Sequence, residues 1–439
     1  MSMLPHDMNY WASFDANKEA GPKESLTAQP SNGSSFNMNQ PIEITVPMRQ
    51  PEFVCDFKNC YVSLDFVNSD ANNIVSFQSY VGTLGIVNQQ VIKTSTGTEF
   101  SNFDGYNVLS PILIEKQVDT NWYGGNGNIL FGMADDSNAK GDDIAANSGD
   151  TIHKILPLIN TGIAQPYFPM GSLADIVLRF KLDTTAVAFS APSATTTPDN
   201  SSITIKNIVL HYDIYKLSPS ALSSIHSRLP NNNYVIDTTD WVHQQYSSPA
   251  TDTKYSVSIG FAKKKAKRLI MVSRDTAELD VLLNKGLMSR NQAGITKVSV
   301  KLDGKIYQNS AGIQMSTTAN NTNYVDAYAE LLKNDGGLLD MKTNSLTLAR
   351  FSKLTGGTAP TTLATCGAWY HEIDFSNSMD TDSSASGVSI DHNNLQVFVE
   401  KDATSAQTVD FFIEFYNQYT MNRNEGVWYV SDPVQYSQA

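Results

Sequence analysis

The amino-acid sequence predicts an all-β protein built from two tandem units of roughly 200 residues each. Its 439 residues are too many for one ordinary hydrophobic core and enough for two. The composition favours strands, because Thr, Tyr, Phe, Val and Ile are abundant while Lys and Glu are few. Short segments that alternate apolar and polar residues recur in two similar series along the chain. Together these observations indicate two successive β-domains.

The first unit is expected at residues 39–218, after an N-terminal arm. Residues 1–38 are rich in Asn, Ser, Pro and Gly and show little periodicity, which predicts a flexible arm with Tyr10 and Trp11 as candidate anchors. Apolar alternation predicts strands at 41–47, 61–67, 129–133, 174–182 and 202–217. A weaker helical pattern is expected at 105–117. Polar loops are expected at 124–128, 134–143 and 190–202.

The second unit is expected at residues 251–431, after a connection at 219–250 and before a C-terminal tail at 432–439. The pair Asp303-Gly304 tolerates positive φ and predicts the turn of a hairpin. A helix should end before Gly336-Gly337. The expected elements are strands at 254–261, 268–273, 368–375, 394–401 and 408–419, the hairpin at 294–308 and the helix at 323–335.

The two units repeat one pattern with an offset of about 200 residues, although their residues differ. Each opens with a short alternating strand, contains one helical stretch and closes on an aromatic-rich strand, at 207–217 and 408–419. Two all-β units of this size with long connections and few helices are typical of two tandem eight-stranded jelly rolls. Immunoglobulin-type sandwiches of about 100 residues would require four units with more regular turn spacing.

The charge balance disfavours nucleic-acid binding as the primary function. The formal net charge is −13, whereas a protein that grips phosphates needs a positive surface. Charged residues make up only 17% of the chain, and Ser, Thr, Asn and Gln replace them. Such a composition suits surfaces that end up against neighbouring subunits.

The cysteines and the N-terminal residues indicate the kind of cellular compartment in which the protein folds. Three cysteines, Cys55, Cys60 and Cys366, form no disulfide framework and fit a protein that folds under reducing conditions. Cys55 and Cys60 lack further ligands at metal-binding spacing, so buried free thiols are the favoured interpretation. The first residues show neither a signal peptide nor any apolar run long enough for a membrane helix.

No motif assigns a catalytic, cofactor-binding or metal-binding residue. The Gly-rich segment at 124–128 lacks the lysine of a phosphate loop. The seven histidines are scattered, and His211 and His371, beside aromatic residues in expected strands, are interpreted as structural. An acidic loop could bind a divalent cation, but a solvated tip is the default interpretation. Its members are Asp135, Asp136, Asp142 and Asp143.

One basic run, Lys263-Lys264-Lys265-Ala266-Lys267-Arg268, resembles a nuclear-import patch. The alternative interpretation is a solvated entry to the strand at 268–273. Residues alone leave both interpretations open.

A more specific resemblance begins at residues 203–245. There a long strand, a helix that starts at Ser218-Pro219 and a short strand follow one another. This order resembles the inter-barrel connection of double jelly-roll major capsid proteins of double-stranded DNA viruses, especially the polinton-like, virophage and adintovirus relatives. Three further segments resemble the start, middle and final strand of their second barrel. These segments are 254–274, 295–308 and 410–432.

The resemblance implies a structural protein rather than an enzyme, without cofactors. Two jelly rolls side by side would let a homotrimer form a pseudo-hexameric capsomer of an icosahedral shell, with long loops as outer towers and clamps between subunits. The implied partners are neighbouring capsomers and minor capsid or penton proteins, without specific nucleic-acid recognition. The implied location is the virion, after synthesis in the host cytoplasm. Nuclear assembly and contact with an internal membrane or genome stay open.

Two other classes compete with this interpretation. A carbohydrate-binding or carbohydrate-active β-sandwich would explain the Trp and Tyr content and the Asn-rich loops, but the chain lacks a secretion signal and a disulfide framework. A viral attachment or penton protein would more often carry one barrel or a fibrous repeat.

Overall fold

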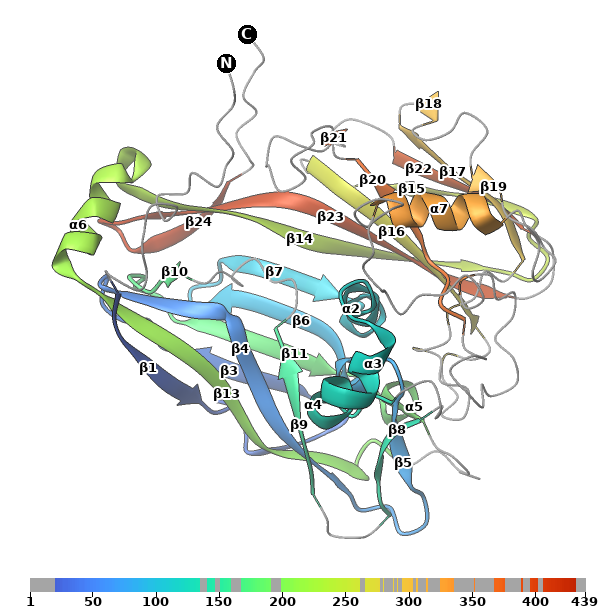
Figure 1. The fold of residues 1–439 in the computed structure, drawn as a ribbon, viewed down its shortest axis with the longest axis horizontal. Coiled ribbons are helices and arrows are strands. Elements are labelled where there is room, and N and C mark those ends of the chain that lie inside the picture. Colours follow the sequence, from blue (N-terminus) through green and yellow to red (C-terminus); the bar gives the residue numbers. More distant parts are fainter. Residues whose placement is uncertain are drawn as a thin grey trace.

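Two antiparallel β-barrels lie side by side in the computed structural model, one formed by the first half of the chain and one by the second (Figure 1). The residues that the structure describes are 20–134, 140–146, 151–158, 167–190, 199–260, 265–276, 279, 287, 290, 294–302, 305–306, 313–314, 324–334, 351, 367–375, 388–389, 395–401 and 406–431.

The first barrel has the strand order of a jelly roll. One sheet runs β1-β13-β4, with β9 and the short β10 both paired to β4, and the other runs β3-β11-β6-β7. Counted in chain order, the eight main strands therefore lie 1-8-3-6 and 2-7-4-5. They are β1 (Ala20–Ala28), β3 (Pro41–Val46), β4 (Phe53–Asn68), β6 (Val87–Thr94), β7 (Glu99–Asp104), β9 (Ile152–Pro157), β11 (Ile176–Leu182) and β13 (Ile203–Leu217); the short β2 (Ser35–Asn37) and β10 (Phe168–Pro169) join the first sheet.

The second barrel repeats this order. Its sheets run β14-β23-β16-β20 and β15-β22-β17-β18, so the same positions, 1-8-3-6 and 2-7-4-5, are filled again. The main strands are β14 (Asn233–Ser248), β15 (Lys254–Ile259), β16 (Lys265–Asp275), β17 (Ile295–Leu302), β18 (Lys305–Ile306), β20 (His371–Asp374), β22 (Leu395–Lys401) and β23 (Gln407–Asn422). The additional β19 (Ile313–Gln314), β21 (Val388–Ser389) and β24 (Val427–Ser431) pair with β17, β16 and β23.

Apolar alternation explains which face each strand buries. In β3, β11, β15 and β22 every second residue is buried, as expected for strands with one face on a core. In β23 every residue from 407 to 417 is buried. This strand is therefore covered on both faces, by its own barrel and by the neighbouring one.

Long connections gather at one end of the first barrel. Strands from three separate connections, β5 (Val75–Gln78), β8 (Lys140–Ile144) and β12 (Phe189–Ser190), pair there in the order β12-β5-β8. The helices cover this end and the side facing the second barrel (Figure 1). They are η1 (Gly82–Ile86), α2 (Tyr106–Glu115), α3 (Thr120–Trp122), the π-helical turn η2 (Tyr123–Gly127), α4 (Asn128–Phe131) and α5 (Thr185–Ala188).

The connection between the barrels starts where expected. Helix α6 (Pro219–Arg228) begins with Pro219, and the hydroxyl of Ser218 accepts a hydrogen bond from the Ala221 amide at 3.1 Å. The short η3 (Pro230–Asn232) follows. Helix α2 in the first barrel and α7 (Tyr324–Asn334) in the second confirm the two helical patterns predicted from the sequence.

The first strand of each barrel differs from expectation. Part of the expected arm forms β1, which pairs with β13 from Ala20 to Ala28, and β2 adds a second pairing. Likewise, β14 pairs with β23 along its whole length, so it belongs to the second barrel rather than to a connection at 219–250. Both are edge strands whose partner lies far along the chain. In the part of β1 from Lys23 to Ala28 most side chains are also exposed, which explains its arm-like composition.

Two predictions at 124–133 are wrong. The expected loop at 124–128 and the first part of the expected strand at 129–133 belong instead to one helical segment, α3, η2 and α4, which the Asp119 side chain caps and which ends at Phe131. A five-residue apolar run fits a helix turn as well as a strand. Here it buries Phe131 and Met133 and leaves Ile129 68% exposed.

The other predicted strands are confirmed within the described residues. The turn residues 303 and 304 lie outside them, although the strands on either side pair at Leu302 and Lys305. Residues 336 and 337 and the tail at 432–439 also lie outside. No described helix has the length and hydrophobicity needed to cross a membrane.

We predict that two deletions will distinguish the N-terminal residues that belong to the first barrel from those that only precede it. Removing residues 1–28 takes away β1 and leaves the edge of β13 unpaired from Leu210 to Leu217, so the melting midpoint should fall by several degrees and aggregation should increase. Removing residues 1–19, which stops just before β1, should leave the midpoint unchanged. Equal midpoints by differential scanning calorimetry would show that β1 adds nothing to the first barrel.

Candidate functional site: the joint between the barrels

The contact between the two barrels is the most elaborate arrangement among the described residues, and we call it the joint. The first barrel contributes β7, β10 and α2, and the second contributes β14, β16, β20, β23 and β24. The strand β7 and the helix α2 lie beside the long strands β14 and β23 (Figure 1).

Aromatic side chains form the apolar part of the joint. Phe100 of β7 contacts Tyr419 and Trp428 edge to face, with ring centroids 4.9 and 5.4 Å apart. Phe168 of β10 stacks on Trp428 at 5.3 Å. All four rings are nearly inaccessible to solvent. Large aromatic rings in such pairs contribute both buried area and orientation-dependent attraction, so they hold the two barrels together at one end.

Hydrogen bonds from side chains to the main chain cross the joint beside these rings. The Tyr419 hydroxyl donates to the carbonyl of Phe100, and the Thr98 hydroxyl donates to the carbonyl of Trp428 at 3.1 Å. The Ser101 hydroxyl donates to the Asp240 carboxylate at 2.8 Å. Because the partners lie on different sheets, these bonds fix how β7 lies along the second barrel.

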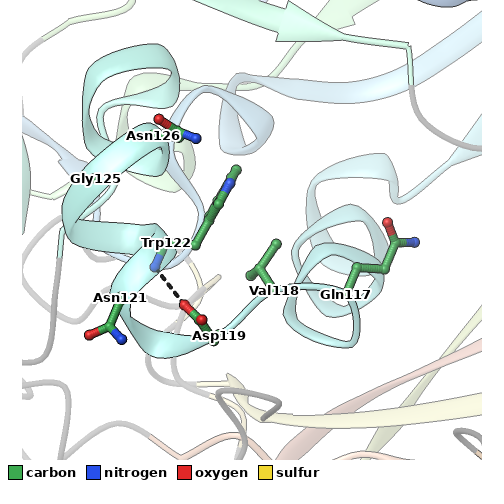
Figure 2. A pocket seen from close by; sticks show the side chains of 7 residues that line it. All are labelled: Gln117, Val118, Asp119, Asn121, Trp122, Gly125 and Asn126. Carbon is green, nitrogen blue, oxygen red and sulfur yellow. Dashed lines mark hydrogen bonds between the residues drawn. The ribbon is translucent and has the colours of Figure 1, made fainter. Parts of the chain in front are cut away.

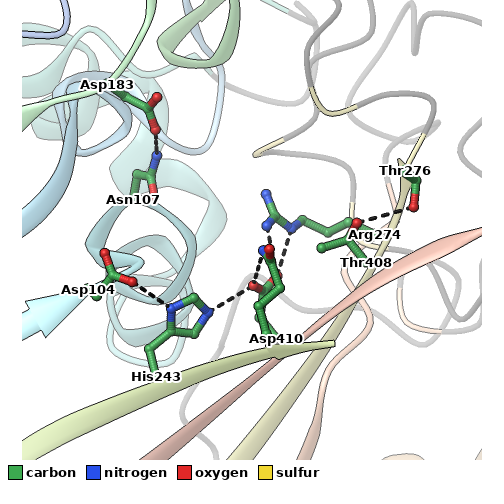
Figure 3. Close-up of polar contacts among 9 residues, drawn as sticks. Asp104, Asn107, Asp183, His243, Arg274, Thr276, Thr408 and Asp410 are labelled. Atoms are coloured by element: carbon green, nitrogen blue, oxygen red, sulfur yellow. Dashed lines mark hydrogen bonds and ion pairs between the residues drawn. The ribbon is translucent and has the colours of Figure 1, made fainter. Parts of the chain in front are cut away.

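A chain of charged groups runs through the joint (Figure 3). The imidazole of His243 on β14 lies between Asp104 of the first barrel, at 3.2 Å, and Asp410 on β23, at 2.9 Å. Arg274 on β16 donates two hydrogen bonds to the other oxygen of Asp410, at 3.0 and 2.7 Å. Asp410 is fully buried; Arg274 and His243 balance its charge, and the Gln245 amide donates a further hydrogen bond to it at 2.9 Å.

The protonation of this chain follows from its geometry. Burial alone would lower the pKa of His243, but the hydrogen bonds to Asp104 and Asp410 outweigh it and raise the pKa to about 9. Burial alone would raise the pKa of Asp410, but Arg274 and His243 hold it well below its usual range. At neutral pH the joint therefore contains an imidazolium between two carboxylates.

The C-terminal end of α2 supplies a second set of ion pairs. Glu115 accepts a hydrogen bond from Arg290, and both side chains are at most 5% exposed. The next residue, Lys116, pairs with Glu372 of β20 at 2.5 Å. Adjacent residues of opposite sign thus each find an opposite charge across the joint. A shift of α2 by one residue would place like charges together, which specifies the register.

These pairs continue into the second barrel. Glu372 also pairs with Arg268 at 3.3 Å, and Arg268 donates to Glu414 of β23. The guanidinium of Arg268 lies 5.1 Å from the ring of Trp241, which stacks on Phe103 of β7 at 6.3 Å. Burial alone would raise the pKa of Glu414, but Arg268 lowers it.

Gly105 lets α2 start against the joint. Its φ of 69° is a left-handed conformation that favours glycine. A Cβ atom there would lie 3.0 Å from the Phe412 ring and 3.2 Å from the His243 imidazole. The absent side chain therefore allows the helix to begin directly over these two rings, which stack on each other at 4.7 Å.

The residues singled out in the sequence do not gather into a site. Asp135 and Asp136 lie outside the described residues, and the Asp143 carboxylate accepts a hydrogen bond from Ser76 at 2.5 Å. No group of three or more His, Cys, Asp or Glu suited to a metal ion occurs among the described residues. Cys55 and Cys60 are buried free thiols, as predicted, and burial raises both pKa values; Cys366 lies outside the described part.

The two predicted structural histidines are placed in strands. His211 lies 3.0 Å from the Ser63 hydroxyl and stacks on Tyr61 at 4.8 Å. His371 is buried, its Nε2 atom has no hydrogen-bond partner within the described part of the chain, and burial lowers its pKa to about 4.

The basic run enters β16, where its last two residues are engaged in the sheet. Lys267 lies 3.7 Å from Glu414, and Arg268 belongs to the joint. This placement favours the strand interpretation over nuclear import, which stays an untested prediction. Residues 263 and 264 lie outside the described part.

Sequence reasoning missed the joint altogether. Its charged residues stand inside strands that are otherwise apolar: Arg274 in β16, and Asp410 and Glu414 in β23. A charge in such a position must be paired if the strand is buried on both faces. The charged residues in these apolar strands therefore indicate that another domain covers the strands. They do not identify the residues with which they pair.

Several solved structures of viral proteins have the same fold as this chain. The PBCV-1 virus capsid protein matches with a TM-score of 0.62 at 10% identity, covering 94% of this chain and 97% of that one. The Sputnik virophage structure gives 0.57 at 10% identity, over 95% and 89%. The Faustovirus major capsid protein gives 0.55 at 10% identity, over 91% and 90%. The chain therefore has the double jelly-roll fold of these proteins, as the sequence predicted.

No protein-family model and no curated sequence matches the chain. Low identity at this structural similarity is consistent with a fold whose order of strands persists while individual residues change.

We predict that stability will fall as pH rises through the pKa of His243. Its pKa is raised from 6.5 to about 9 in the folded state, so its contribution is complete below pH 6.5 and is lost as pH approaches 9. The loss should be on the order of 3 kcal/mol in the free energy of unfolding, measured by urea titration at pH 6.5 to 9.5. In His243→Gln this dependence should disappear; parallel curves for both proteins would contradict it.

We also predict that Glu115 and Arg290 are strongly coupled. Glu115→Met leaves a buried guanidinium unpaired and should destabilise the protein by about 3–5 kcal/mol, whereas Glu115→Met with Arg290→Met should recover most of that loss. The exposed pair Lys254–Glu400, 3.4 Å apart, is the control, and Glu400→Met should change stability by less than about 1 kcal/mol. Additive effects of the two joint substitutions would refute the coupling.

Proposed function

We propose that this chain is the major capsid protein of a double-stranded DNA virus with an icosahedral shell. In this proposal it forms homotrimers, and each trimer presents six jelly rolls as a pseudo-hexameric capsomer. Its role is structural rather than enzymatic. The observation that carries the proposal is the joint, because it holds two barrels of identical strand order side by side as one rigid unit.

The geometry supports this role in a specific way. A threefold assembly can resemble a hexagon only if each subunit supplies two similar bodies at a constant separation and angle. Paired charges, aromatic stacking and main-chain hydrogen bonds together fix that angle here. A hinged linker between two free domains would not produce a regular lattice element.

The proposed partners are other copies of the chain, neighbouring capsomers and minor capsid or penton proteins. The proposed location is the virion. The net charge of −13 supports a shell surface rather than specific recognition of nucleic acid. We propose that residues 1–19, which precede β1, link neighbouring capsomers, a narrower arm than the sequence suggested.

We predict that averaged negative-stain images of the purified full-length protein will show trimers with a pseudo-hexagonal outline and six densities. The expected mass by light scattering is three times 48.2 kDa. Deleting residues 1–19 should leave these trimers intact while impairing the formation of shells.

Monomers or dimers with an open cleft would contradict the capsid proposal. They would favour the alternative from the sequence, a carbohydrate-active or carbohydrate-binding sandwich. Trimers that collapse after deletion of residues 1–19 would show that this segment belongs to the subunit contacts instead of linking capsomers.

A further inference from the structure

An open groove lies beside the joint, at the loop-rich end of the first barrel. It encloses about 580 Å³ between the end of α2 and the helical segment α3–η2. Its lining consists of Gln117, Val118, Asp119, Asn121, Trp122, Gly125 and Asn126. The volume falls in the range of small-molecule sites, and four of the seven lining residues carry an amide or a carboxylate.

The polar lining is unoccupied by the protein's own hydrogen bonds. Among the described residues, the side-chain amides of Gln117, Asn121 and Asn126 make no hydrogen bond, and Asn121 and Asn126 are exposed. Asp119 uses one oxygen to accept from the Trp122 amide at 2.9 Å. Its other oxygen is available. Each free amide offers two donors and one acceptor in a plane.

The indole of Trp122 is held in place as one wall of the groove. It contacts the rings of Tyr123 and Phe131, with both centroids 5.6 Å away. Gly127 lies directly against it, since a Cβ atom there would come within 2.9 Å of the indole. Figure 2 shows the indole facing the side chain of Val118, with Asn126 at the rim above it and Gln117 beyond Val118.

The backbone around the groove is irregular in a way that opens it. The segment from Tyr123 to Gly127 is a π-helical turn, and Gly125 departs from helical geometry with φ −100° and ψ −106°. A Cβ atom at Gly125 would meet nothing within 4 Å. The chain therefore bends at Gly125 beside the groove.

We propose that this groove binds a neutral carbohydrate. A sugar ring has an apolar face of C–H groups and a rim of hydroxyls that each donate and accept. The fixed indole and Val118 suit the apolar face, and the three free amides and the Asp119 oxygen suit the rim. The polar lining opposes a lipid-like ligand. Asp119 and the net charge of −13 oppose an anionic one.

This inference concerns binding by the chain itself and does not require the capsid proposal. If the chain does build a shell, every copy carries the groove. Many weak contacts with a glycan-covered surface would then add to a strong attachment.

The test uses the full-length protein with four methyl glycosides as probes. Three are neutral, the α-mannoside, the β-galactoside and the N-acetyl-β-glucosaminide, and one is anionic, the glycoside of N-acetylneuraminic acid. Saturation-transfer NMR and the Trp fluorescence of the protein report binding. We expect at least one neutral glycoside to bind with a Kd in the millimolar range and the anionic probe to bind at least tenfold more weakly.

The variant Asn121→Ala with Asn126→Ala should weaken the neutral glycoside at least tenfold, since both residues are exposed and the fold does not depend on them. Asn424→Ala, an exposed position on the β23–β24 turn, is the matched control and should bind like the wild type. No binding of any neutral probe, preference for the anionic probe, or equal binding by the double variant would each overturn the proposal. Trimer images from the same preparations distinguish its failure from that of the capsid proposal.

Discussion

The fully buried carboxylate of Asp410 is the constraint around which the two barrels are arranged. Removing a charge from water is so unfavourable that a protein tolerates it only with partners at close range. Arg274 comes from the same sheet, but the second cation, His243, is itself held by Asp104 of the other barrel. The internal electrostatics of the second barrel are therefore completed by the first. The barrels cannot separate without exposing or unpairing these charges.

Much of the fold was predictable because most strands turn one face towards solvent and the other towards the core of their barrel. Alternation identified β3, β11, β15 and β22 correctly. The same signal failed at β1 and β14, the first strand of each barrel, since an edge strand resembles a solvated segment and its partner comes almost a whole barrel later. It also failed at 129–133, where Phe131 packs on Trp122 and Gly132 lies against the Phe77 ring, so tertiary packing rather than local propensity selects the conformation.

The joint was not predictable in the same way. Its pairs join residues that are far apart, as in Glu115 with Arg290 and Asp104 with His243. A single sequence shows that Asp410 and Glu414 stand in an apolar strand and need partners, but no local pattern chooses among the cations of the chain. The groove is equally hidden, because its walls come from the end of one helix and from a π-helical turn that sequence patterns do not reveal.

The length and position of β23 have a consequence for how the chain folds. This strand closes the second barrel, covers β14 along its whole length and carries the anion of the joint, yet it leaves the ribosome only after the other seven main strands of that barrel. At a synthesis rate of about 5–20 residues per second, roughly 10–30 seconds pass between the synthesis of β14 and that of β23. During this time the edge of β14 that pairs with β23 is unpaired. Chains truncated before β23 therefore lack both the closed barrel and the fixed angle between barrels. Incomplete translation products would therefore lack the fixed shape that a regular assembly requires and would not enter it.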